Sequence, residues 1–175
     1  MVDIYQLLLQ IGAIKKGEFI LRSGKKSNYY VDIKESITDP RILNILISSL
    51  ADQLNETSEN PNAIAGMELG AVPLIVALSL KLNIPYIIIR KEKKEYGISN
   101  RIIGKIPNGQ IAIIEDVVTT GKTVSDCISL LRESGAIVRS VYAIVDRNEG
   151  GEPLLSGMGV NLHALVKMGA NNGSK

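Results

Sequence analysis

Short, continuous apolar runs constrain the fold of this chain more than any other feature of its sequence. The runs are AIAG at 63–66, YIII at 86–89, IAII at 111–114 and VYAIV at 141–145. None alternates apolar with polar residues, which is typical of strands that are buried on both faces. Helical patterns at about 71–82 and 122–134 separate the first run from the second and the third from the fourth. The order predicts strand–helix–strand units and therefore a mostly parallel sheet.

The N-terminal part of the chain predicts three further elements. Segment 2–13 has the spacing of a helix with one buried stripe, and segment 18–34 contains two β-prone runs around a Ser/Gly/Lys-rich stretch, which indicates a hairpin. Pro40 suits the first turn of a helix that starts after Thr38 or Asp39. The apolar residues of the first stripe are Ile4, Leu7, Leu8 and Ile11.

Composition excludes several classes of function. The 175 residues and 45% hydrophobic content predict a single domain over 1–175 with a sizeable core. An aromatic content of 4% and a net charge of +2 argue against nucleic-acid binding by base stacking or by a strong positive field. Cys127 is the one cysteine, which excludes an intrachain disulfide framework and a cysteine-rich zinc site. The apolar run at 69–80 is too short to cross a membrane, so we expect a cytoplasmic protein with no membrane partner.

The segment IAIIEDVVTTGKT, at 111–123, carries the strongest chemical signal. An apolar run leads into Glu115 and Asp116 and then into hydroxyl and glycine residues at the expected start of a helix. Backbone N–H groups of residues 119–123 can surround an anion there, and Gly121 lets the backbone approach closely. The two carboxylates repel phosphate and need hydroxyl donors or a metal-bound water. A ligand with both a phosphate and sugar hydroxyls satisfies both halves of the motif.

This segment resembles the phosphoribosyl diphosphate (PRPP) signature of the type I phosphoribosyltransferases. Two more segments, 17–34 and 90–104, resemble the substrate-binding hairpin and the mobile catalytic loop of the orotate phosphoribosyltransferase family. With MELGAVP at 67–73 and VDRNEGG at 145–151, the resemblance spans nearly the whole chain in family order.

The resemblance implies an α/β fold of the type I phosphoribosyltransferase kind, with a mostly parallel central sheet flanked by helices and a small N-terminal β-hairpin hood formed mainly by 17–34. It implies transfer of the 5-phosphoribosyl group from PRPP to orotate, giving orotidine 5′-monophosphate and diphosphate in pyrimidine biosynthesis. Mg²⁺ assists the family's reaction, bound mainly through PRPP and water with no direct protein ligand. The family also implies a homodimer in which the mobile loop of one subunit completes the other's site.

The same resemblance assigns site residues position by position. Lys94 and Asp116 are the expected catalytic residues, and Arg147 is expected to contact the orotate carboxylate or a neighbouring carbonyl. The expected PRPP-binding residues are Arg90, Lys91, Lys94, Glu115, Asp116, Val117, Val118, Thr119, Thr120, Gly121, Lys122 and Thr123. The expected orotate-binding residues are Thr119, Arg147, Arg22, Tyr30 and Val31, with Tyr30 stacking on the base.

The sequence departs from its relatives at two positions and leaves other functions open. Tyr96 stands where many bacterial members have histidine, and Gly70 where some have lysine; Glu68 is unfavourable beside a diphosphate unless it faces away or holds a metal-bound water. His163 is expected in the core or in a strand. The alternatives are a purine phosphoribosyltransferase, a PRPP-sensing regulator without turnover, and a non-catalytic nucleotide-binding subunit.

Overall fold

The strands form a large central sheet and a separate small one in the computed structural model, which describes residues 2–20, 26–57, 59–91 and 101–169. The central sheet has the order β5-β4-β3-β6-β7-β8, and only β5 runs antiparallel to its neighbour. This confirms the predicted mostly parallel sheet. The bounds are β3 (Ala63–Met67), β4 (Tyr86–Ile89), β5 (Ile102–Ile103), β6 (Gln110–Val118), β7 (Ile137–Asp146) and β8 (Asn161–Lys167).

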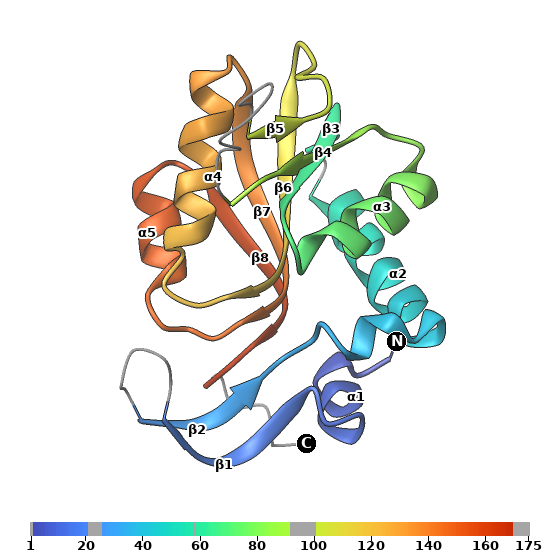
Figure 1. Ribbon diagram of the computed structural model, residues 1–175, viewed down its shortest axis with the longest axis vertical. Coiled ribbons are helices and arrows are strands. Elements are labelled where there is room, and N and C mark those ends of the chain that lie inside the picture. Colours follow the sequence, from blue (N-terminus) through green and yellow to red (C-terminus); the bar gives the residue numbers. More distant parts are fainter. Residues whose placement is uncertain (1, 21–25, 58, 92–100, 170–175) are drawn as a thin grey trace.

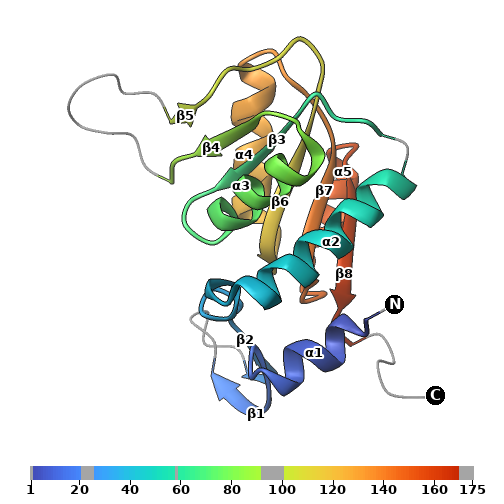
Figure 2. The same ribbon diagram turned by 90° about the vertical axis from the view of Figure 1, so that its right-hand side faces the viewer.

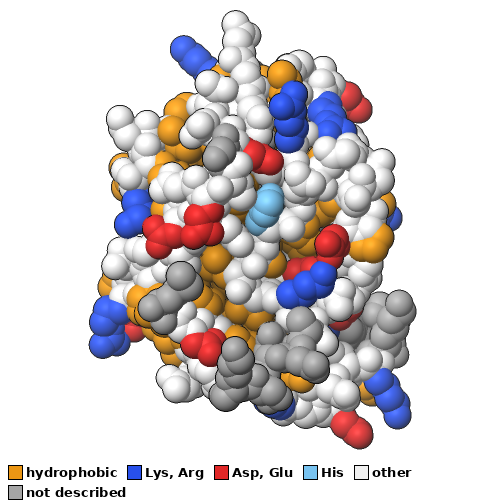
Figure 3. Space-filling model, turned by 180° about the vertical axis from the view of Figure 1, so that it is seen from behind, with side chains coloured by type: hydrophobic (Ala, Val, Ile, Leu, Met, Phe, Trp, Pro, Cys, Tyr) orange, Lys and Arg blue, Asp and Glu red, His pale blue; other side chains and the backbone are white. Residues whose placement is uncertain are grey.

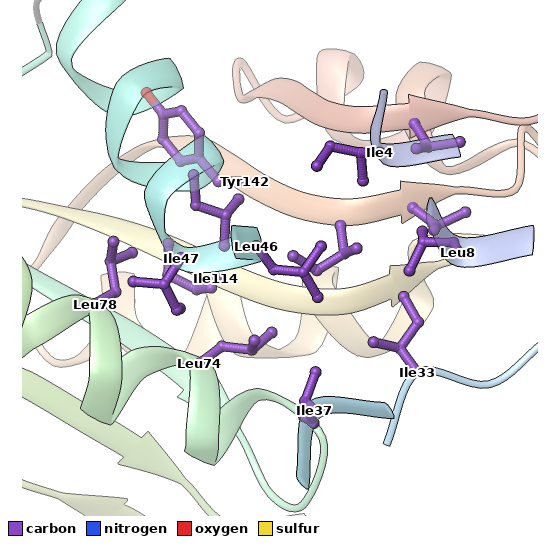
Figure 4. Close-up of a cluster of buried hydrophobic side chains, with 14 of the residues drawn as sticks. Ile4, Leu8, Ile33, Ile37, Leu46, Ile47, Leu74, Leu78, Ile114 and Tyr142 are labelled. Carbon is purple, nitrogen blue, oxygen red and sulfur yellow. The ribbon is translucent and has the colours of Figure 1, made fainter. Parts of the chain in front are cut away.

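Helices cover both faces of the central sheet (Figures 1 and 2). On one face lie α2 (Pro40–Glu56) and α3 (Ala71–Leu82), and on the other lie α4 (Lys122–Glu133) and α5 (Gly151–Gly157). A separate cluster of buried apolar residues fills the space on each side. Figure 4 shows the first cluster, where Leu46 of α2 and Leu74 of α3 meet Ile114 of β6. The strands are therefore buried on both faces, as their unbroken apolar runs predict.

The small sheet is a hairpin of β1 (Ile14–Ile20) and β2 (Lys26–Val31), packed beside α1 (Ile4–Gln10). It lies below the carboxyl ends of the parallel strands in the view of Figure 1. Ile33, which follows β2, is fully buried in the same cluster as Leu8 of α1 and Leu46 of α2. This shared core fixes the hairpin and the residues after it against the central sheet.

The start of α2 matches its sequence signals. Pro40 occupies the first turn, and the Asp39 carboxylate accepts a hydrogen bond from the backbone N–H of Arg41 at 2.8 Å. The short 3₁₀ turn η1 (Ser36–Thr38) joins the hairpin to this helix. The N–H groups of the first helical turn have no partner within the helix, so a proline, which has no N–H, is well tolerated there. Pro40 therefore marks the start of α2.

β8 is an edge strand of the central sheet and carries His163, whose ring stacks on Tyr142 of β7 with centroids 4.9 Å apart. Figure 3 shows the histidine in the middle of this face of the molecule, with hydrophobic surface beside it. The expectation that His163 lies in a strand is confirmed. Among the described residues, none of the helices combines the length and apolar character needed to cross a lipid bilayer.

Candidate active site

Two buried carboxylates lie side by side in the second half of β6. Glu115 is 8% exposed and Asp116 is 6% exposed. Asp116 Oδ1 accepts a hydrogen bond from the Val117 N–H at 2.9 Å, and Glu115 Oε1 accepts one from the Asp116 N–H at 3.2 Å. Burial, followed by the proximity of Asp116, raises the pKa of Glu115 well above its ordinary value. The pair therefore favours ligands and side chains that donate hydrogen bonds or carry positive charge.

β6 extends to Val118, further than the apolar run alone indicates, because the end of β7 continues to pair with it. Val118 lies opposite Asp146, and the Arg147 N–H donates to the Val118 carbonyl at 2.8 Å. The acidic pair consequently lies within the strand rather than after it. Its position near the carboxyl end of a central strand is where open α/β sheets bind ligands.

The turn from β6 into α4, residues 119–123, has the backbone arrangement of a candidate anion cradle. Gly121 has φ of 76°, and a Cβ there would lie 3.0 Å from the Cα of Gly151, at the start of α5. The first N–H groups of a helix have no intrahelical partner, and the helix dipole adds positive potential at that end. The predicted PRPP motif is therefore a strand, a tight turn and a helix N-terminus in the arrangement that binds phosphate.

Asp116 also faces Gly70 at the start of α3 and Lys34 after the hairpin. A Cβ on Gly70 would lie 2.2 Å from Asp116 Oδ2, so the carboxylate occupies the space beside this glycine. Oδ2 receives no well-aligned hydrogen bond from the described part of the chain. The charge that it faces is the Lys34 ammonium at 3.2 Å. Lys34 is not among the site residues predicted from the sequence; it lies in the turn after β2, where its N–H donates to Asp32 Oδ1 at 3.1 Å.

The predicted orotate-binding Arg147 lies at the carboxyl end of β7, next to the anion cradle. Its guanidinium is 10% exposed, pairs with Glu149 at 2.8 Å and donates to the Ser27 hydroxyl on β2 at 3.2 Å. A planar cation therefore lies between the hairpin and the phosphate-binding turn. Neither Ser27 nor Glu149 was predicted, because their roles depend on a contact between β2 and β7 that the sequence does not specify.

The basic segment that follows β4 is held at its base by three hydrogen bonds. The Arg90 N–H donates to the Arg101 carbonyl at 2.8 Å, and Arg101 Nε donates to the Arg90 carbonyl at 3.0 Å. The Lys91 N–H donates to Glu68 Oε1 at 3.0 Å. Glu68 is thereby turned towards the base of this segment. Lys94 and Tyr96 lie outside the described residues.

The hairpin divides its predicted site residues between two faces. Ser27, Tyr29 and Val31 lie on the same face of β2, because side chains alternate between the two faces of a strand. Tyr29 and Val31 pack against the core. Tyr30 is on the other face, 42% exposed, with its ring centroid 5.7 Å from that of Phe19. The structure therefore does not bring the Tyr30 ring to the Arg147 side of the strand. Arg22 lies outside the described residues.

Comparisons with known proteins agree with this geometry. Residues 34–158 match the phosphoribosyl transferase domain family. The orotate phosphoribosyltransferase of Thermoplasma acidophilum is 49% identical over 162 residues, 92% of this chain and 91% of that protein. That of Methanopyrus kandleri is 43% identical over 161 residues, 92% of this chain and 86% of that protein. The crystal structure of orotate phosphoribosyltransferase from Aeropyrum pernix superposes with a TM-score of 0.85 at 30% identity, covering 96% of this chain and 94% of that one.

Proposed function

This chain belongs to the orotate phosphoribosyltransferase family, and from that premise we propose how its residues transfer the 5-phosphoribosyl group of PRPP to orotate. The reaction forms a bond between a ring nitrogen of orotate and C1′ of the ribose while the bond from C1′ to the diphosphate breaks. The product, orotidine 5′-monophosphate, belongs to pyrimidine biosynthesis. Positive charge develops at C1′ and negative charge on the departing diphosphate.

The 5-phosphate and the ribose of PRPP bind at the β6–α4 turn. The backbone N–H groups and hydroxyls of residues 119–123 hold the phosphate, supported by the dipole of α4. Asp116 accepts hydrogen bonds from the ribose hydroxyls through Oδ2, which has no hydrogen-bond donor in the described part of the chain. Glu115 accepts a hydrogen bond from the Asp116 N–H and so supports the position of Asp116.

The departing diphosphate requires positive charge, for which we propose Arg90, Lys91 and Lys94. Arg90 and Lys91 sit at the base of the basic segment, tied to Arg101 and Glu68. Mg²⁺ prefers oxygen ligands and keeps several waters while it binds phosphates. We propose that PRPP and water hold most of the coordination of Mg²⁺, as the family resemblance implies. When bound, it offsets the charge of the leaving group.

Arg147 is the residue that distinguishes orotate from other bases in this proposal. The backbone N–H of Arg147 donates to the Val118 carbonyl, next to the cradle, and the guanidinium donates to Ser27 on the hairpin. This placement is the observation that carries the substrate assignment. A guanidinium fork matches a carboxylate through paired hydrogen bonds. A purine or uracil has no such carboxylate and cannot form these paired hydrogen bonds with Arg147. Thr119, at the start of the cradle, is placed to contact the other edge of the base.

We propose a homodimer that buries the outer face of α3, because this helix exposes apolar side chains. α3 has apolar residues on nearly all sides; Lys81 is its only charged residue, while Leu80 is 80% exposed and Leu69, just before the helix, is 75% exposed. A helix that is apolar all round is normally buried. The occupant that we propose is the same face of a second copy, a self-complementary arrangement that closes into a dimer. This interface lies next to Gly70 and so next to the site.

The test of the substrate assignment is the ultraviolet absorbance of orotate in the presence of the purified chain, PRPP and Mg²⁺. Adenine, hypoxanthine and uracil serve as controls. We expect orotate to be consumed and Arg147→Ala to narrow the preference for orotate over uracil by roughly tenfold or more, since removing the hydrogen-bond partner of the orotate carboxylate costs about 1–3 kcal/mol. Arg139→Ala, exposed at the other end of β7, is the matched control. Turnover of a purine but not orotate would refute the assignment.

A further inference from the structure

The acidic pair on β6 has a cationic partner outside the PRPP motif. In the described part of the chain, the only ion pair that involves Glu115 or Asp116 joins Asp116 Oδ2 to Lys34 Nζ at 3.2 Å. Lys34 also approaches Asp32 Oδ1 at 3.7 Å. It belongs to the segment that leaves the hairpin. The contact therefore links the hairpin to the site of ribose binding.

The orientation of the Asp116 carboxylate depends on this contact. Oδ1 is fixed by the Val117 N–H at 2.9 Å, and Oδ2 is directed into the space left by Gly70. No donor with hydrogen-bond geometry reaches Oδ2 from the described residues, so the ammonium is the group that holds this oxygen. The side chain of Lys34 remains 55% exposed, which leaves it free to move when a ligand enters.

The protonation of the pair depends on the same cation. Burial raises the pKa of Glu115, and the neighbouring Asp116 raises it further, while Lys34 acts in the opposite direction. Burial works against the charge of Lys34 itself, but Asp116, with Asp32 and Glu115, outweighs it and raises the pKa of Lys34.

We propose that Lys34 is a positioning residue for phosphoribosyl transfer: its ammonium keeps the Asp116 carboxylate oriented until the ribose hydroxyls of PRPP bind to it. The inference rests on the proposed role of Asp116 as the ribose acceptor. Because Ile33 is fully buried in the core, the backbone of the neighbouring Lys34 is anchored near β6, while its side chain remains partly exposed. The hairpin thus contributes to PRPP binding through Lys34 as well as to the binding of the base.

The first experiment measures kcat and both KM values for Lys34→Met and Lys34→Arg. We expect Lys34→Met to raise KM for PRPP by about tenfold or more, the scale of one charged hydrogen bond, with KM for orotate nearly unchanged. Lys34→Arg keeps the charge, so its KM for PRPP should stay close to that of the wild-type chain. Lys26→Met is the matched control, since Lys26 lies on the same hairpin, on the face of β2 opposite Ser27. An unchanged KM for PRPP in Lys34→Met would overturn the proposal.

A double-mutant cycle tests whether Lys34 acts through Asp116. In an Asp116→Asn background we expect Lys34→Met to have little further effect on PRPP affinity, measured by calorimetry, because the carboxylate that it positions is gone. Additive losses would show that Lys34 acts elsewhere and would also overturn the proposal. Circular dichroism verifies that each variant is folded.

Chemical rescue provides an independent measurement. Lys34→Cys treated with 2-bromoethylamine regains an ammonium group at nearly the same distance from the backbone. Native Cys127 is 1% exposed, and burial raises its pKa to about 12, so it should remain unmodified. Recovery of PRPP affinity supports the proposal, and modification without recovery contradicts it. If the unmodified wild-type chain failed to use orotate, the proposed function would fail instead, which separates the two outcomes.

Discussion

The molecule contains two strand–turn–helix units of similar build, β3–α3 and β6–α4, whose helices differ. Both helices have twelve residues and both begin after a glycine. α4 has polar residues such as Lys122, Asp126 and Ser129 on its exposed side, whereas α3 exposes Leu80 and has Lys81 as its one charged residue. The difference fits the proposed dimer, in which α3 faces a second copy.

The two glycines differ in what they make possible. Gly121 has φ of 76°, which L side chains rarely adopt, and it packs closely on Gly151. Gly70 has φ of −63°, an ordinary helical value, and its missing side chain leaves room for the Asp116 carboxylate. One glycine is required by the backbone and the other by a neighbouring side chain. Variants of each unit can therefore separate the stability of the fold from the binding of PRPP.

Gly121→Ala should have the largest effect. Strain at positive φ costs about 1–3 kcal/mol of unfolding free energy, and displaced N–H donors should lower kcat/KM for PRPP by on the order of 10²–10³. Urea unfolding and steady-state kinetics measure the two losses. Gly135→Ala, with φ of 88° and open space around it, should show the strain without the kinetic loss. Equal kinetic losses in both variants would argue against the anion cradle.

Gly70→Ala should raise KM for PRPP by roughly tenfold, because the methyl group displaces Asp116 from its hydrogen-bonding position. The melting temperature should change little, since alanine accepts the backbone conformation of Gly70. Gly157→Ala in α5, where nothing lies within 4 Å, is the control. A variant with normal PRPP affinity would show that Asp116 can shift without consequence.

Leu80→Lys on α3 should weaken self-association roughly tenfold, because it places an unpaired charge in the proposed interface. Ser129→Lys on the exposed side of α4 should leave association unchanged. Sedimentation equilibrium at several protein concentrations compares the two. If both variants associate like the wild-type chain, the dimer does not use α3.

Glu115→Gln should have the smallest effect, a gain of about 1 kcal/mol in the free energy of unfolding. Because the pKa of Glu115 in the folded chain is raised above the ordinary 4.5, the folded state binds this proton more tightly than the unfolded state. The contribution of Glu115 to unfolding free energy is thus present below pH 4.5 and lost as pH rises through the raised pKa. The gain from Glu115→Gln should therefore be larger at pH 8 than at pH 4, measured by urea unfolding. Exposed Glu133→Gln should show no such difference.

The sequence predicts most of the fold because local patterns decide it. Unbroken apolar runs correctly predict β3, β4, β6 and β7, and proline and spacing correctly predict α1 and α2. α5 has seven residues and β5 has two, too few for a period to be recognised. The extension of β6 to Val118 depends on pairing with β7, which acts between segments distant in sequence.

The site is less predictable for the same reason. The cradle at 119–123 is continuous in sequence and is visible as a motif. The partners of Arg147 and Asp116, namely Ser27 and Lys34, come from the hairpin and become neighbours only through packing. The face on which Tyr30 lies follows from the register of β2, which the sequence of the hairpin alone does not fix.

The mutual bonds of Arg90 and Arg101 bring together two residues that are eleven positions apart. For a segment whose ends are already fixed, the entropy lost on closure grows only with the logarithm of its length, about 0.6 kcal/mol for each doubling. Insertions or replacements between these arginines should therefore cost the sheet little. The chain can therefore vary the residues between these arginines, Tyr96 among them, without altering the central sheet.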